Sequence, residues 1–224
     1  MKSDLSGKIQ RVKPIAPSLI FLLMTGLACN VSMFNEAFTP SGAFLYQETF
    51  STPNSRWDER MLEAGAVGYA NDAYRIQLHF PNAQLWSRPG LYLNDVRVEA
   101  TVLSAGAPES RMGVLCRLVD DQNFYFFVIS ADGFYGIGKM RAGQASLLTG
   151  AGAMLPTDTI FTGNLPNQVR GDCIGKTLTL YVNNRLVDST ADGDFFAGDV
   201  GLLAGTSAQP ETEVYFDNFF VIKP

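Results

Sequence analysis

The chain has 224 residues, of which 46% are hydrophobic and 17% charged, and its 17 basic and 22 acidic side chains give a formal net charge of −5. This length is enough for one domain with a substantial hydrophobic core. The acidic balance argues against a nucleic-acid partner, because the phosphates of nucleic acid bind clustered Lys and Arg side chains. It also argues against attachment to anionic lipid through a polybasic surface.

The first 28 residues have the pattern of an export signal. A start that carries four of the 17 basic residues precedes an apolar run at 15–28, which ends in the small residue Ala28. A basic start, a short apolar run and a small-residue cleavage site are typical of secretory signals. Because the run has 14 residues and contains Pro17, it is too short for a membrane-spanning helix, which needs about 20 residues.

A cysteine follows this run. The sequence Gly26-Leu27-Ala28-Cys29 resembles a bacterial lipobox, although Gly26 replaces the aliphatic residue usual three positions before the cysteine. The resemblance implies that residues 1–28 are removed, that Cys29 is diacylated, and that the protein is extracytoplasmic and lipid-anchored in the cell membrane or outer membrane. The remaining chain carries 13 basic and 21 acidic residues, a formal net charge of −8. The alternative is an ordinary secretory signal that contains a cysteine by chance.

Two further cysteines remain once Cys29 is assigned to the lipid. An even pair in an exported protein is favoured to form a disulfide, because extracytoplasmic compartments are oxidising. We therefore predict a bridge between Cys116 and Cys173. The alternative is that both are separate buried thiols that pack as small hydrophobic side chains.

The chain from Leu45 onward has the pattern of a β-protein, preceded by a tether at 29–44 that shows neither alternation nor helical period. Alternation of apolar and polar residues predicts half-buried strands at 74–80, 96–102, 177–182 and 214–222. Continuous apolar runs predict strands buried on both faces at 113–119, 124–129 and 201–204. Turn sequences such as Asp132-Gly133 separate these runs. The sequence thus predicts an all-β domain at 45–224, an antiparallel two-sheet jelly-roll sandwich.

Several stretches carry a resemblance to a known group of domains, at residues 46–57, 113–117, 123–133, 172–183 and 214–219. Together they resemble the concanavalin A-like, laminin-G-like jelly-roll domains of bacterial surface proteins, including the 3-keto-disaccharide hydrolase-like group. The resemblance implies two antiparallel sheets, one of them curved, with sugar-binding or protein-binding relatives that use the concave side. A fold by itself does not assign a function.

Catalytic patterns are sparse. Glycoside hydrolysis needs two carboxylates that flank the scissile bond, and family 16-type hydrolases, which share this fold, hold them in a Glu-x-Asp-x-x-Glu strand motif that is absent here. A Ser-His-Asp or Cys-His device could be built only around His79, the single histidine. His79 lies on the polar phase of its predicted strand, which indicates a surface position. The sequence therefore leans against an enzyme.

A structural calcium ion is one implication of the resemblance, because related jelly rolls often join the first strand to the last through calcium. Carboxylate oxygens are ligands that this ion prefers, and Glu48 and Asp217 fall in the first and last predicted strands. Asp217 shares its alternation phase with Phe219. The alternative is that these carboxylates accept hydrogen bonds from backbone amides or from Asn218.

A candidate ligand face follows from strand register. A two-residue turn at Asp132-Gly133 would set Phe126 opposite Lys139, and a second such turn at 121–122 would set Arg117 opposite Phe126. With one residue from the neighbouring predicted strand, the candidate ligand-binding residues are Arg117, Tyr135, Lys139, Phe126 and Trp86. Aromatic area beside fixed cations suits a sugar ring. The alternative is a face covered by a loop, with the cations extending outward.

The sequence as a whole favours a surface-anchored lipoprotein whose domain is a non-catalytic binding module for a glycan or a cell-envelope partner. Two alternatives remain open. One is a glycoside hydrolase-like enzyme that acts on a disaccharide or polysaccharide, and the other is a structural lipoprotein that binds only another protein.

Overall fold

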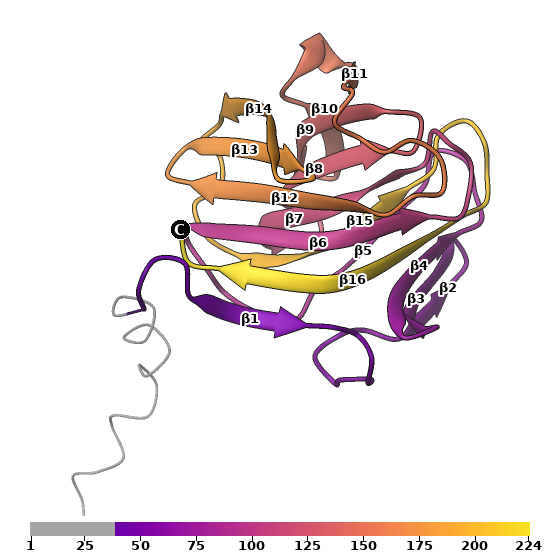
Figure 1. Ribbon diagram of the computed structural model, residues 1–224, viewed down its shortest axis with the longest axis horizontal. Helices are drawn as coiled ribbons and strands as arrows, with labels where there is room; N and C mark the ends of the chain where they lie inside the picture. Colours follow the sequence, from indigo (N-terminus) through magenta and orange to yellow (C-terminus); the bar gives the residue numbers. More distant parts are fainter. Residues whose placement is uncertain (1–38) are drawn as a thin grey trace, which may run out of the picture. The chain divides into compact units, whose positions relative to one another are not determined.

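Two antiparallel β-sheets stacked face to face make up the described part of the chain, residues 39–224, in the computed structural model (Figure 1). This arrangement confirms the predicted all-β jelly-roll sandwich. Residues 1–28, Cys29 and most of the predicted tether lie outside the described residues. Within residues 39–224 there is no helix with the length and apolar character needed to cross a membrane.

The first sheet has nine strands, and one of them lies outside its main path. In spatial order it consists of β14 (Arg185–Ala191), β13 (Thr177–Val182), β12 (Asn167–Ile174), β6 (Val96–Ser104), β16 (Thr212–Ile222), β4 (Ala73–Leu78), β3 (Gly65–Ala70) and β2 (Arg60–Leu62), with β1 (Phe44–Glu48) paired to β16.

The second sheet has seven strands. In spatial order it consists of β10 (Gln144–Leu147), β9 (Phe134–Arg141), β8 (Asn123–Ser130), β7 (Arg111–Asp120), β15 (Asp199–Gly205) and β5 (Gln84–Ser87), with β11 (Leu155–Pro156) paired to β9. The 3-10 turn η1 (Gly150–Gly152) lies between β10 and β11.

The burial of the strands follows the sequence pattern. In β6 every second side chain is buried and the others are partly exposed, as the alternation predicts for a strand with one face in the core. In β8 all residues after Asn123 are buried, as the continuous apolar run predicts. The two sheets therefore differ: the nine-stranded sheet has a polar outer face, and the seven-stranded sheet is apolar on both faces.

The core between the sheets is held by a disulfide as well as by packing. Cys116 on β7 is bonded to Cys173 on β12, with a Cα–Cα distance of 6.8 Å. The predicted bridge is confirmed. Beside it, Gly171 lies against the ring of Phe127, where an added Cβ would come within 2.2 Å of a ring carbon. Only glycine lets the two sheets approach this closely at that point.

A second apolar layer covers the outer face of the seven-stranded sheet. It comprises Leu115, Leu118, Phe124, Phe126, Val128, Met140 and Leu203, with Trp86, Leu147 and Met154 packed against them. Glycines on neighbouring strands make room for these large side chains. A Cβ at Gly138 would lie 2.3 Å from a ring carbon of Phe126, and one at Gly136 would lie 2.7 Å from Leu147. The outer face is thus filled by its own side chains.

The register of the β8–β9 hairpin differs from the prediction by one residue. The loop has three residues, 131–133, and ends in Gly133 at a φ of +98°. Phe126 consequently pairs with Gly138, and Lys139 pairs with Tyr125. Since a slip of one residue turns every side chain of a strand to the other face, Tyr135 lies on the core side of β9. The predicted two-residue turn was wrong.

Bulges interrupt two other strands at residues with positive φ. In β7 the register shifts after Cys116, Arg117 has a φ of +50°, and Leu115 rather than Arg117 pairs with Phe126. In β16 the register shifts after Asp217, and Asn218 also has a φ of +50°. The β7 bulge adds one residue relative to β15 and two relative to β8, and the β16 bulge adds one residue relative to β6. A bulge of this kind changes the phase of the side chains that follow it. The predicted Arg117–Phe126 pairing and the shared phase of Asp217 and Phe219 were therefore wrong.

Replacing Cys116 and Cys173 together with Ala should lower the free energy of unfolding by about 4 kcal/mol in the chain-entropy model, because the bridge spans a sequence separation of 57 residues. Chemical denaturation measured with and without a thiol reductant tests this. The reductant should lower the stability of the wild-type protein and leave the double variant unchanged. Equal stability of the two proteins without reductant would contradict the prediction.

Candidate functional site

Arg117, the first of the predicted ligand residues, is 1% exposed. Its Nη1 donates to the carbonyl oxygens of Gly175 at 2.8 Å and Phe195 at 3.0 Å. Its Nη2 donates to Asp95 Oδ1 at 3.0 Å, and its Nε to the carbonyl oxygen of Asn94 at 3.4 Å. The guanidinium group therefore joins three loops at one end of the sandwich and does not face the outer surface of the sheet.

Tyr135 and Lys139 are also occupied by contacts within the protein. The Tyr135 hydroxyl donates to Asp188 Oδ2 at 3.0 Å, and Lys139 Nζ donates to Asp192 Oδ2 at 2.5 Å and to Asp194 Oδ2 at 2.7 Å. The hydrogen bonds that Lys139 donates to these two carboxylates raise its pKa. These bonds link β9 to β14 and the segment after it, and they close one side of the sandwich.

Phe126 and Trp86 belong to the outer apolar layer. Trp86 lies against Phe124 with ring centroids 5.2 Å apart, and Phe124 in turn lies 6.4 Å from Phe126. The structure thus brings these two predicted residues into one layer and places the other three elsewhere. The five residues do not share a face, because the β8–β9 slip and the β7 bulge separate them.

The two predicted calcium ligands face hydrogen-bond donors. Glu48 Oε1 accepts from the backbone N–H groups of Thr49 and Phe50 at 3.1 and 3.0 Å, and Oε2 accepts from Asn54 Nδ2 at 2.5 Å. Asp217 accepts from Asn218, through the backbone N at 2.7 Å and Nδ2 at 3.0 Å. These hydrogen bonds are the alternative that the sequence left open for Glu48 and Asp217, and a calcium ion at the two carboxylates stays a prediction. Residues 39–224 contain no group of three His, Cys, Asp or Glu side chains arranged to hold a metal.

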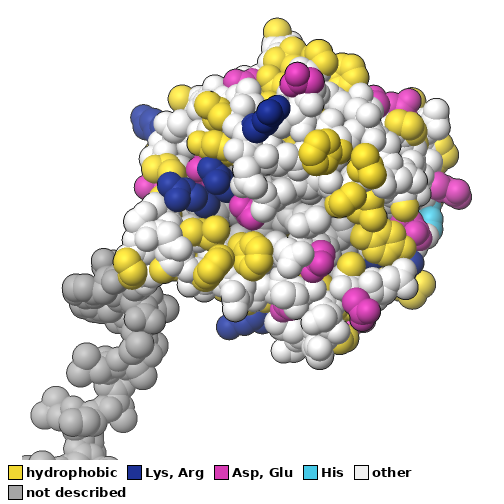
Figure 2. All heavy atoms as spheres, in the orientation of Figure 1, with side chains coloured by type: hydrophobic (Ala, Val, Ile, Leu, Met, Phe, Trp, Pro, Cys, Tyr) yellow, Lys and Arg dark blue, Asp and Glu magenta, His cyan; other side chains and the backbone are white. Residues whose placement is uncertain are grey.

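The outer face of the nine-stranded sheet carries an ion-pair network. Asp172, 5% exposed, lies 3.4 Å from Arg97 Nε and 2.9 Å from Arg170 Nε. Burial raises the pKa of Asp172 and the two guanidinium groups oppose this rise. Arg170 also lies 3.7 Å above the ring of Tyr181. Figure 2 views this side of the molecule, where basic and acidic side chains lie among one another and no large single-sign surface forms.

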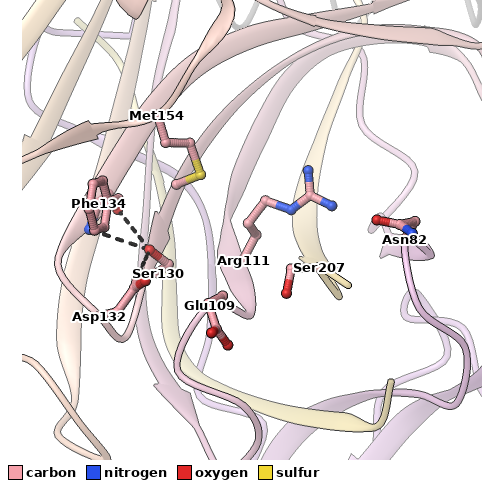
Figure 3. A pocket seen from close by; sticks show the side chains of 8 residues that line it. All are labelled: Asn82, Glu109, Arg111, Ser130, Asp132, Phe134, Met154 and Ser207. Carbon is pink, nitrogen blue, oxygen red and sulfur yellow. Dashed lines mark hydrogen bonds between the residues drawn. The ribbon is translucent and has the colours of Figure 1, made fainter. Parts of the chain in front are cut away.

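A hollow of about 380 Å³, which the sequence analysis missed, lies at one end of the seven-stranded sheet (Figure 3). The ends of β7, β8 and β9 and the loops beside them supply its walls. The lining residues are Asn82, Glu109, Arg111, Ser130, Asp132, Phe134, Met154 and Ser207.

Arg111 is the central cation of this hollow (Figure 3). It begins β7, pairs with Ser130 on one side and with Gly205 on the other, and its Nη2 donates to the carbonyl oxygen of Thr206 at 2.7 Å. A Cβ at Gly205 would lie 3.4 Å from Arg111 Nε, an ordinary contact distance. Arg111 forms no ion pair with any residue in 39–224. Burial lowers the pKa of Arg111, but an arginine stays protonated in proteins.

Hydrogen-bond acceptors and apolar side chains line the same hollow as this cation. Asp132 and Glu109 are exposed, and the Ser130 hydroxyl donates to Asp132 Oδ1 and holds that carboxylate in place. Phe134, 37% exposed, and Met154 supply apolar surface. The hollow thus combines fixed N–H donors, carboxylate acceptors and an apolar wall. Such a set can bind a hydroxyl-bearing ring through its polar edge and its C–H face.

Comparisons with known proteins identify the fold. No family model and no curated protein matches the sequence. Among solved structures, the chain is similar to the carbohydrate-binding module CBM66 from Bacillus subtilis, with 18% identity, a TM-score of 0.60, and coverage of 75% of this chain and 95% of that one. At this identity the similarity shows the fold alone, a concanavalin-like jelly roll.

Two other solved structures agree with this result. A Bacillus subtilis protein of unknown function with a galectin-like fold matches at 13% identity and a TM-score of 0.59, with coverage of 82% of this chain and 97% of that chain. The Bacillus licheniformis β-glucanase matches at 10% identity and a TM-score of 0.58, with coverage of 83% and 99%. Proteins of different activities therefore share this architecture.

Replacing Arg117 with Met should lower the free energy of unfolding by roughly 3 kcal/mol, because buried carbonyl groups would lose their donor. Arg141→Met is the matched control: this side chain is 67% exposed with one ion pair, to Asp194, so we expect a change below about 0.5 kcal/mol. Chemical denaturation measures both. A stable Arg117→Met variant with selectively lost ligand binding would instead restore the ligand role predicted from the sequence.

Proposed function

We propose that the chain is a carbohydrate-binding protein, anchored through lipid at Cys29, and that the hollow around Arg111 is its binding site. The observation that carries this proposal is the Arg111 guanidinium group, which has no carboxylate partner in the described chain and lines the hollow together with carboxylate acceptors and apolar side chains. Vicinal hydroxyl groups of a sugar can accept from the guanidinium and donate to Asp132 or Glu109, while Phe134 contacts the C–H face of the ring.

The structural neighbours support a glycan as the ligand class. One of them is named as a carbohydrate-binding module and another as a β-glucanase. The hollow lies at the low end of the range for small-molecule sites, which is about 300–1,000 Å³. A ligand of one or two sugar units suits this size better than a long chain bound across the sheet, since the outer face beside the hollow is filled by apolar side chains.

Hydrolysis of a glycoside is the second candidate, because the hollow contains two carboxylates, Glu109 and Asp132. A catalytic acid usually occupies an apolar site that keeps it protonated at neutral pH. Both side chains are exposed here, so the surroundings favour binding over catalysis. His79, the single histidine, is exposed at the end of β4 and does not line the hollow.

A glycan-array screen should identify a ligand whose affinity falls about 10-fold or more in Arg111→Ala and in Asp132→Asn, since a hydrogen bond to a charged group contributes about 1.5–3 kcal/mol. Calorimetric titration measures the affinities. Arg141→Ala, which removes an exposed guanidinium outside the hollow, should bind as the wild type does. All three variants should keep the wild-type melting temperature within a few degrees.

Two results would contradict this assignment. Unchanged affinity in both hollow variants would place the site elsewhere, and an array without any hit would favour the alternative of a structural lipoprotein that binds only protein. Product release from a bound oligosaccharide, abolished by Glu109→Gln, would favour the hydrolase.

The anchoring part of the proposal rests on the sequence at 1–29. Intact-mass analysis of membrane-extracted protein should show the loss of residues 1–28 and a diacylglyceryl adduct, and Cys29→Ser should remove the adduct. Mature protein that retains residues 1–28 would contradict both the lipoprotein and the secretory interpretation.

A further inference from the structure

Both ends of the sandwich expose large apolar side chains, with Phe161 53% and Phe134 37% exposed at the hollow end, and it is the opposite end that lies where the chain enters the domain. At that opposite end Tyr92 is 72% exposed, Phe196 59%, Val119 56% and Ile174 36%. Arg111 begins β7 at the hollow, and Val119 lies near the other end of the same strand. At the usual rise per strand residue, the hollow and Val119 are about 26 Å apart. We call these four side chains the apolar end.

The apolar end is held rigidly by Arg117. The loops that carry three of its four members each present a backbone carbonyl to this guanidinium, from Asn94, Gly175 and Phe195. The loops before β6 and before β15 also bond to each other, through the backbone groups of Leu93 and Gly198 at 2.9 and 3.0 Å. Hydrogen bonds therefore fix the backbone of the loops that carry these exposed side chains.

The chain enters the domain at this same end. The backbone N–H of Gly42 donates to the carbonyl of Lys223 at 2.8 Å, and that of Lys223 donates to Ala43 at 2.9 Å. Residue Ile222 pairs with Phe44 on one side and with Arg97, near the start of β6, on the other. Figure 1 shows the start of β1, the C-terminus and the start of β6 at one end of the sandwich.

The length of chain between Cys29 and Thr39 limits how far this end can lie from an anchored lipid. Ten residue steps span at most about 35 Å when fully extended. A tether of this reach keeps the domain next to the bilayer, but it leaves many orientations open. Apolar contact with the bilayer at the end where the chain enters would select one of them.

We propose that the apolar end rests on the lipid bilayer, with Tyr92 and Phe196 in the membrane interface, so that the hollow points away from the membrane. The inference rests on the proposed lipid anchor. Tyr favours the interface because its ring is shielded while its hydroxyl stays hydrated, and Phe contributes an apolar ring that enters the boundary of headgroups and acyl chains. The chain from Cys29 onward has a formal net charge of −8, so this contact depends on apolar area and does not need anionic lipid.

The test uses the full lipidated protein in zwitterionic phosphatidylcholine vesicles whose acyl chains carry bromine, which quenches Trp fluorescence on contact. Tyr92→Trp and Phe196→Trp each add a reporter to the apolar end. Phe161→Trp is the matched control, because Phe161 is an aromatic residue 53% exposed in the segment that bonds to the β8–β9 loop beside the hollow. We expect brominated lipid to reduce the emission of both apolar-end reporters and to leave that of Phe161→Trp at the wild-type level.

Each other outcome overturns the inference. Quenching at both ends to the same extent would show no preferred orientation, and quenching at neither end would show no lipid contact. A blue shift of the Tyr92→Trp emission without quenching would mean that a second copy of the chain covers this end. Mass analysis of the same sample distinguishes a failed anchor from a failed orientation. If the diacylglyceryl adduct is missing, the anchoring proposal fails as well. If the adduct is present, only the inferred orientation fails. Glycan affinity measured on the vesicles tests the hollow independently.

Discussion

Two consecutive residues of β7 hold the two sheets and the loops at one end in a fixed relation. Cys116 points into the core and is bonded to Cys173 on the opposite sheet. Arg117 takes a positive φ, leaves the plane of the strand and donates to backbone carbonyls of three loops. A covalent bond between the sheets and a buried guanidinium group that joins the loops thus come from neighbouring residues of one strand. Because β7 lies inside the seven-stranded sheet and starts at the hollow, its position also sets that of Arg111.

Properties that depend on averages along the chain were predictable from the sequence. The alternation in β6 follows from one face in the core and one face toward water, and it needs no knowledge of neighbouring strands. The disulfide was predicted from the expected export and the cysteine count, although the strands of Cys116 and Cys173 are far apart in sequence. Both inferences tolerate an error of one residue, since neither uses the exact pairing of strands.

The predicted ligand face failed because it required exact pairing. A third residue in the loop at 131–133 moved Tyr135 and Lys139 to the core side, and the bulge at Arg117 moved that residue out of the strand. Neither change leaves a clear mark in an apolar-polar pattern. The hollow left a weaker signal in the sequence, because only Arg111 stands at the outer phase of its strand. Finding the hollow required knowing that the loops of Glu109 and Asp132 meet there.

The bulge in β7 divides the strand into two phases, and this has a consequence for how the sequence can change over evolution. Leu115 before the bulge and Leu118 after it both belong to the outer apolar layer, although they are three positions apart. In an uninterrupted strand, residues three apart face opposite sides. Substitutions that keep the length of this segment leave its two phases in place. Deletion of one codon here would place Leu118 in the position of Arg117 and remove the donor that joins the loops, so homologous chains should keep the length of this segment constant even where its residues vary.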